Sequence, residues 1–396
     1  MNVQSSMGDT DSPSEKLPIE LIHHIIADID TDQGLSALRA CSLVCLAWAD
    51  ICRSCIFRSV VVHCHSFASR LSFLYDTAPH LCKYVLELTI HEDYGTRTSW
   101  MPPEWTPELF GWLKNLRSLA FFCVTGEVSA LPAPMANGLP TLLQAPRLRK
   151  LHIQHWNFEN DVQALHHMLS LCSASLEHLA LVGVSSNSTV HELATVRLAA
   201  LSTLRLHYVN HPGLTEAFLQ CPNLRSMEMG IEDGRLFFPS DVENLNLTVE
   251  RLGSVPELQR TTRLSALTIS ALTCPTTISD FHVWLKGCTH RLLRPDLLSQ
   301  LTLELQHDRT TTEYPELAEY KAFSAYLAQF RDRSGLKQIS IDITLFTWEE
   351  SPAPYIIHHA REVAKLKDGF APVLGLGVDI RLHVRSLSSV LMECRA

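Results

Sequence analysis

One pattern of hydrophobic and polar positions recurs along most of this chain. An aliphatic residue is followed by two variable residues and then by an apolar, a variable and an apolar residue. Alternate residues of a strand face opposite sides, so the last two apolar positions of each window point into a core. The pattern predicts ten short strands, within windows 85–90, 116–121, 148–153, 176–181, 201–206, 224–229, 242–247, 264–269, 298–303 and 336–341.

The residues around each inward pair indicate that one face of these strands meets solvent. Of the 30 residues before, between and after the ten pairs, 24 are polar. Strands buried on both faces, as in an ordinary α/β sheet, would be apolar on both. The windows start on average about 28 residues apart, although single spacings run from 18 to 38. This period resembles that of leucine-rich repeats, at ~20–29 residues, without their usual asparagine, and implies an irregular solenoid.

Stretches with apolar residues three to four positions apart lie between the windows and predict helices. Proline often separates such a stretch from the next window, as at Pro146 and Pro222, because it cannot continue a helix. The expected fold class is therefore α/β, with about 10 or 11 strand-helix repeats. The helical stretches are 165–171, 215–219, 281–286, 320–330 and 357–366.

The segment 14–60 has a different pattern, which predicts three helices. Pro18 suits the first position of a helix that carries isoleucines at helical spacing. A break is expected over Asp30–Gly34, a second helix from Leu35 to Cys45, and a third around Trp48. About 45 residues are marginal for independent stability. The first helix is apolar nearly all round, which predicts burial on two sides and hence a partner or neighbour.

This segment resembles an F-box, and an F-box followed by leucine-rich repeats is a known family arrangement. One departure is Ala47, where the family often has Arg or Lys. The matching residues are Leu17-Pro18-x-Glu20-Leu21-x3-Ile25-Ile26, Leu35, Cys41-Ser42-Leu43-Val44-Cys45-x2-Trp48 and Phe57.

The resemblance implies that the segment docks on the Skp adaptor of a cullin-RING (SCF-type) ubiquitin ligase. It assigns direct adaptor contact first to Leu17, Pro18 and Leu21, whereas Val44 and Trp48 are either contacts or internal core. The full set of implied adaptor-binding positions is Leu17, Pro18, Ile19, Glu20, Leu21, Ile25, Leu38, Val44, Cys45 and Trp48.

Composition and charge narrow the class of protein. The 33 Lys and Arg against 42 Asp and Glu give a net charge of −9, which argues against a nucleic-acid or anionic-membrane binder. No apolar run approaches the ~18 residues of a membrane helix. The first 16 residues are polar and acidic, unlike a signal peptide. We expect a cytoplasmic and/or nuclear protein with a disordered tail over 1–13, an F-box over 14–60 and a repeat domain over 61–396.

Other residue clusters have both a functional and a structural interpretation. Cys52 and Cys55, with His63-Cys64-His65 downstream, have the residue types of a zinc site. The three downstream residues alternate faces of a strand and cannot all bind one ion, so we expect neither metal nor cofactor. Histidines on the outward strand face, and tryptophans in a Pro-rich insert, are candidates for target binding or simply surface and packing residues: His91, His152, His178, Arg205, His207, Trp100 and Trp105.

The sequence thus predicts a substrate-receptor subunit, with a target protein that it does not name. No nucleophile elbow, HExxH, phosphate-binding loop or dinucleotide fingerprint is present. Two alternatives stay open. One is a repeat scaffold with no role in ubiquitin conjugation, and the other is an enzyme, such as a thiol hydrolase using one of the 12 cysteines.

Overall fold

The computed structural model describes a large part of the chain in detail, and the contacts within it divide the chain into two compact units. Unit 1 comprises Met1–Cys123 with Ala130–Arg149, and unit 2 comprises Val124–Ser129 with Lys150–Ala396. The described residues are 18–29, 31–63, 66–92, 104–122, 133–156, 158, 162–172, 174–185, 198–209, 221–231, 238–249, 255–256, 258, 261–271, 278–308, 317–347, 364–365, 367–371 and 378–386.

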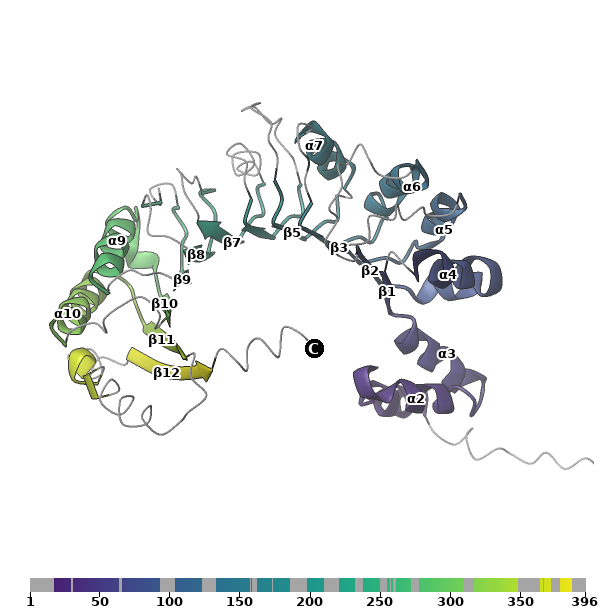
Figure 1. The fold of residues 1–396 in the computed structure, drawn as a ribbon, viewed down its shortest axis with the longest axis horizontal. Coiled ribbons are helices and arrows are strands. Elements are labelled where there is room, and N and C mark those ends of the chain that lie inside the picture. Colours follow the sequence, from purple (N-terminus) through teal and green to yellow (C-terminus); the bar gives the residue numbers. More distant parts are fainter. Residues whose placement is uncertain are drawn as a thin grey trace, which may run out of the picture. The chain divides into compact units, whose positions relative to one another are not determined.

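Unit 1 begins with three helices and continues into parallel strands with helices between them. The strands β1, β2 and β3 pair in chain order, and α4, α5 and α6 lie on one side of them (Figure 1). The elements are α1 (Ile19–Ala27), α2 (Thr31–Cys41), α3 (Leu46–Ile56), β1 (Ser59–His63), α4 (Phe67–Ser72), η3 (Phe73–Thr77), η4 (Pro79–Tyr84), β2 (Glu87–His91), α5 (Thr106–Trp112), β3 (Ser118–Phe122) and α6 (Ala133–Leu143).

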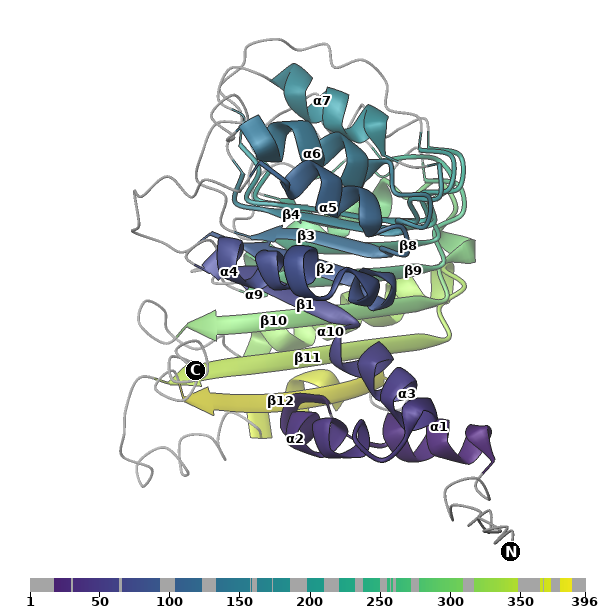
Figure 2. The same ribbon diagram turned by 90° about the vertical axis from the view of Figure 1, so that its right-hand side faces the viewer.

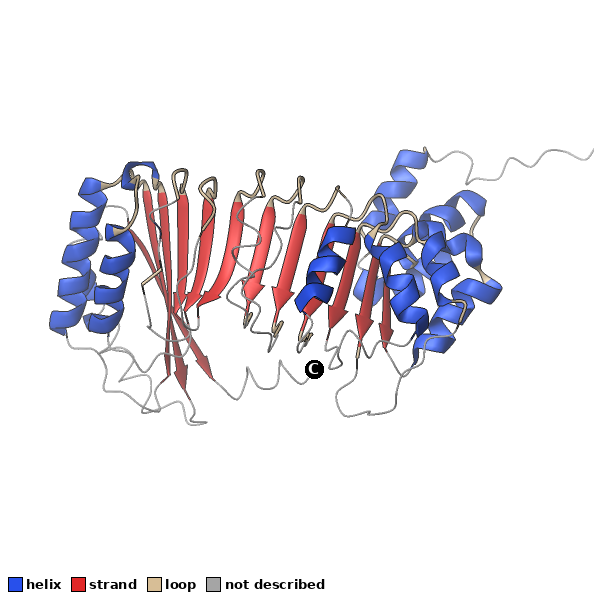
Figure 3. Cartoon of the chain, turned by 90° about the horizontal axis from the view of Figure 1, so that it is seen from above, coloured by secondary structure: helices blue, strands red, loops and turns tan. Residues whose placement is uncertain are grey.

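Unit 2 is a parallel sheet in which each strand pairs with the next strand of the chain (Figures 2 and 3). The helices α9 and α10 cover one face of its later strands (Figure 1). The elements are β4 (Lys150–Gln154), α7 (Val162–Leu171), β5 (His178–Val182), β6 (Thr203–His207), β7 (Ser226–Ile231), β8 (Asn244–Val249), β9 (Ala266–Ala271), α9 (Ile278–His290), η7 (Pro295–Leu297), β10 (Gln300–Asp308), α10 (Leu317–Arg333), β11 (Gln338–Thr347) and β12 (Val378–Ser386).

The ten predicted strands are confirmed as β2 to β11, each beginning two residues into its window. Both inward residues of every window are at most 2% exposed, as Leu151 and Ile153 illustrate. The leading aliphatic residue of each window is buried as well. The repeat pattern therefore marks the core correctly, and the fold is an α/β chain of strand-helix repeats compatible with a solenoid.

The predicted helices are confirmed in part. Those at 165–171, 281–286 and 320–330 correspond to α7, α9 and α10. The stretch 215–219 and most of 357–366 lie outside the described residues. The helices α5 and α6 were not expected, because both stand in the Pro-rich segments between the first windows, and α6 even contains Pro140.

The three N-terminal helices form, but three of their expected boundaries are wrong. Pro18 is the residue before α1 and not its first helical residue. The break over Asp30–Gly34 is shorter than expected, since α2 starts at Thr31 and includes Gly34. A Cβ at Gly34 would collide with Ile29, so glycine here lets the end of α1 pack closely on α2. The second helix ends at Cys41, which leaves Val44 in a turn.

Candidate functional site

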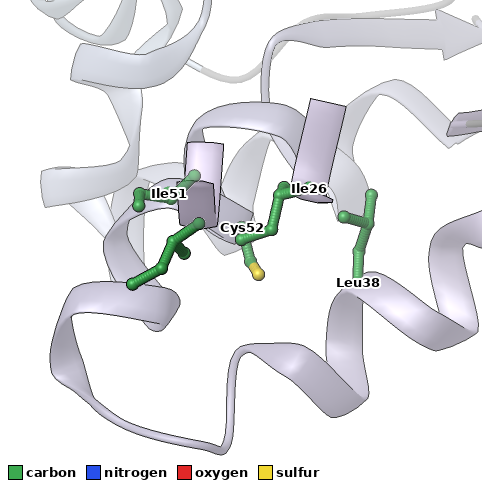
Figure 4. Packing of buried hydrophobic residues seen from close by; sticks show 5 residues of the cluster. Ile26, Leu38, Ile51 and Cys52 are labelled. Atoms are coloured by element: carbon green, nitrogen blue, oxygen red, sulfur yellow. The ribbon is translucent and has the colours of Figure 1, made fainter. Parts of the chain in front are cut away.

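The three N-terminal helices share a small core that fixes which side chains point outward. Ile22 and Ile26 from α1 meet Leu38 from α2 and Ile51 and Cys52 from α3 (Figure 4). All five are at most 6% exposed. Partly buried residues, among them Trp48, pack around this core. Leu38, implied as an adaptor contact, therefore lies at 0% exposure inside the core, where it holds the helices together.

A second set of apolar side chains on the same helices is exposed, and we call it the docking set. Each member is at least 42% exposed, and Leu43 and Leu46 reach 86% and 87%. The helix α1 buries Ile22 and Ile26 in this core, whereas its Ile19, Leu21 and Ile25 are exposed, so burial on a second side stays a prediction. The members are Ile19, Leu21, Ile25, Leu35, Leu43, Val44 and Leu46.

The remaining implied adaptor positions are distributed around this set. Pro18 and Glu20 are exposed beside it, whereas Leu17 lies outside the described residues. Cys45 is partly buried and extended, and its carbonyl accepts a hydrogen bond from Ala49 N at 2.9 Å. Of the two positions left open by the sequence, Val44 is exposed and Trp48 packs on the core.

The third helix is also tied to the first repeat of unit 1. The Tyr84 hydroxyl at the end of η4 donates to the Asp50 carboxylate on α3. The Lys83 ammonium lies 3.8 Å from the same carboxylate. Past the helix, Arg58 pairs with Glu87 at 3.8 Å. These contacts connect the docking set to the repeats through a short, polar joint.

Burial raises the pKa of several of the thiols that a zinc site or a thiol enzyme could use. Burial, with the neighbouring Cys41 and Cys55 thiols, raises the pKa of Cys52. Burial alone raises the pKa of Cys172 to about 12, and burial is the main cause that raises that of Cys82 to about 11. A metal ligand or nucleophile is the thiolate, which these sites disfavour. Across the described part of the chain, no three His, Cys, Asp or Glu residues are grouped to hold a metal ion.

The strand face of unit 2 opposite its buried side carries most of the predicted target-binding residues. Arg205 is exposed on β6, and His152 on β4 and His178 on β5 are partly buried. His207, also on β6, is only 8% exposed. Burial, with the Arg205 charge as a smaller cause, lowers the pKa of His152.

The residue that organises this face, Glu228 on β7, was missed by sequence reasoning. One of its oxygens lies 2.9 Å from His207 Nε2 and 3.3 Å from Arg205 Nε. The hydrogen bond from His207 is the main cause that lowers the pKa of Glu228, and Arg205 adds to it. Arg205 and Glu228 occupy equivalent positions of adjacent windows, and that equivalence was the available signal.

The turns that follow these strands contain an unusual backbone conformation. His155 after β4 and Tyr208 after β6 have φ of 58° and 52°, and Gly183 after β5 has 63°. A Cβ at Gly183 would collide with the His155 ring, so only glycine fits there. Non-glycine residues in this region cost about 1–2 kcal/mol each. Tyr208 adopts this conformation and is 45% exposed, so its aromatic side chain is accessible to a partner.

Two predicted target-binding residues of unit 1 are held by neighbouring rings. His91 on β2 stacks between His63 and Phe122, with ring centroids 5.2 and 4.7 Å away. Trp105 stacks on Tyr75 at 4.9 Å, and this packing gives it a structural role. Trp100 lies outside the described residues.

Comparisons with known proteins add no identification. The chain matches no protein-family model, and no curated protein matches it either. Within the described residues we find no helix with the length and hydropathy needed to cross a bilayer. The structure thus defines a class, an α/β strand-helix repeat chain with a three-helix N-terminal module and an open apolar docking set. The function has to be argued from these surfaces.

Proposed function

We propose that this chain is an F-box substrate receptor of an SCF-type cullin-RING ubiquitin ligase. The three-helix module binds the Skp adaptor, and through it the cullin, while the repeats bind a target protein. The chain itself supplies no chemistry. It holds the target close to the ubiquitin-transfer machinery, which raises the effective concentration of the target there.

The single observation that carries the proposal is the exposure of the docking set. The side chains of Ile19, Leu21 and Ile25 stand half in solvent although the helix beneath them is packed. Burying a Leu or Ile side chain completely stabilises by about 1.5–3 kcal/mol. A partner that covers the exposed half of each therefore gains about 1 kcal/mol per residue. These residues also match the F-box motif, so position and exposure favour the same surface.

The test is adaptor binding by the full-length chain. Recombinant Skp adaptor is titrated by calorimetry against the wild-type chain and a Pro18→Ala, Leu21→Ala double variant. We expect the double variant to bind at least about fivefold more weakly, since the loss of about 1 kcal/mol at Leu21 alone gives that factor.

The chain offers a matched control in Leu293, which follows α9 in unit 2. Leu293 is 57% exposed against 50% for Leu21. Leu293→Ala should leave adaptor affinity unchanged. Equal affinity for the double variant and wild type would show that the docking set is not the adaptor surface. No adaptor binding by any version would refute the F-box assignment itself.

The role in ubiquitination needs a separate readout. In cells that lack the chain, a protein captured by its repeats should persist longer, and re-expression of the wild type but not of the double variant should restore its turnover. A captured protein whose half-life is the same in all three backgrounds would instead favour a scaffold.

A further inference from the structure

The outward strand face of unit 2 has an uneven charge. The nine outward positions of β4, β5 and β6 contain no Asp or Glu, and they include the permanent cations Lys150 and Arg205. The corresponding positions of β10 to β12 contain one cation and three acids, namely Arg381 with Glu304, Asp342 and Asp379. A chain with a net charge of −9 therefore carries one locally basic face, over β4 to β6.

Arg205 is held in a way that leaves part of its guanidinium open. Its ion pair with Glu228 uses Nε, at 3.3 Å, and the same carboxylate oxygen accepts from His207 Nε2. The closest approach to Glu228 is made by Nε, so the two terminal Nη nitrogens of Arg205 lie farther from that carboxylate. The Arg205 side chain is 49% exposed. The guanidinium is thus oriented before any ligand arrives, with two donors suited to a carboxylate.

The surroundings of Arg205 add contact area and one further cation. Lys150 is exposed two strands away on β4, and His178 lies on the strand between. Tyr208, directly after β6, presents a half-exposed ring. Tyr and Arg are the residues most often found to carry binding energy at protein interfaces.

We propose that the outward face of β4 to β6 binds an acidic segment of another protein, with one carboxylate on the Nη donors of Arg205. Charge complementarity favours this occupant, because the outward positions of β4 to β6 hold Lys150 and Arg205 and no acid, while Glu228 on the neighbouring β7 is shared between Arg205 and His207. The inference rests on the proposed function only in treating this segment as part of the recruited target.

The test uses two libraries of 15-residue peptides on the full-length chain. One library carries Asp or Glu at alternating positions, and the other carries Asn or Gln at the same positions. We expect binding of acidic peptides only, falling steeply with salt. Arg205→Ala should weaken the best peptide about tenfold, the loss expected for a charged hydrogen-bond pair. Arg205→Lys keeps the positive charge but loses the paired donors of the guanidinium, so its peptide affinity should lie between those of wild type and Arg205→Ala.

Arg225→Ala is the matched control. Arg225 is also an exposed arginine paired to a glutamate of the next repeat, Glu243, but it stands before β7 and off the basic face. This variant should bind like wild type. Hydrogen exchange over β6 checks that Arg205→Ala is folded. The proposal is overturned if both libraries bind equally, if Arg205→Ala and Arg225→Ala behave alike, or if binding requires phosphoserine peptides.

This outcome is separable from the adaptor experiment. Leu21→Ala should lose adaptor affinity and keep peptide affinity, and Arg205→Ala should do the reverse. A chain that binds the adaptor but no acidic peptide refutes this inference alone. A chain that binds acidic peptides but no adaptor refutes the F-box proposal and leaves this one standing.

Discussion

Leu38→Ala tests whether the three-helix module depends on its own small core. The helices have 9, 11 and 11 residues, below the ~12–15 at which isolated helices become stable. Leu38 is one of five residues in the core that joins them, and it is fully buried. Truncating a buried leucine to alanine costs about 2–5 kcal/mol, because it removes apolar contact and leaves a cavity. Even a loss of about 2 kcal/mol raises the fraction of molecules in which the module is unfolded about 30-fold.

Hydrogen exchange with mass spectrometry on the full chain measures this effect directly. Peptides over 19–56 should lose protection in Leu38→Ala, while peptides over β6 to β8 in unit 2 keep it. Leu35→Ala on the same helix removes a side chain that is 42% exposed and should change protection in 19–56 by far less. If Leu38→Ala and Leu35→Ala lower protection equally, the division into a buried core and an open docking set is wrong.

Two further predictions concern the repeats. Gly183→Ala forces a side chain into a left-handed turn against His155, so we expect the unfolding free energy to fall by about 2 kcal/mol. Gly111→Ala should cause no loss, because the added Cβ meets no other atom. Urea titration compares them, and equal midpoints would contradict the backbone argument. Glu228→Gln should lower stability at pH 7, because the contacts from His207 and a nearby arginine lower the Glu228 pKa in the folded state. A lowered carboxylate pKa stabilises the folded state at pH above the ordinary carboxylate pKa, and this contribution is lost as pH falls through the folded pKa. The stabilities of the two proteins should therefore converge in acid, and a difference that stays constant with pH would refute the linkage.

The repeat strands could be predicted because their pattern depends on two local facts, strand alternation and the burial of one face. The same rule fails at the two end strands. Before β1 the leading position is the aromatic Phe57, and before β12 it is Gly375, so neither segment fits the aliphatic pattern. The pattern detects repeats that resemble their neighbours, and terminal repeats depart from it.

The candidate site was predictable only where a residue's role follows from its own helix or strand. The exposure of Ile19, Leu21 and Ile25 follows from a first helix that is apolar nearly all round. The Arg205–Glu228 pair does not, because it depends on which positions of adjacent repeats fall in register across about 20 residues of sequence. For Trp105 the sequence left an exposed hot spot and a packing role equally open, since it gives no sign that Tyr75, 30 residues earlier, stacks on its ring.

The boundary between the three-helix module and the repeats is less sharp than a limit at residue 60 implies. The helix α3 supplies Ile51 and Cys52 to the three-helix core. One residue earlier, its Asp50 accepts the Tyr84 hydroxyl of η4 and lies near Lys83. Adjacent residues of a helix point about 100° apart, so a single helix can serve both neighbours at once. The module and the first repeat therefore share α3, and the orientation of the docking set follows that of the first repeat within unit 1. For the receptor function that we propose, this sharing has a use, because tethering promotes transfer only if it holds the target at a defined distance from the point of transfer.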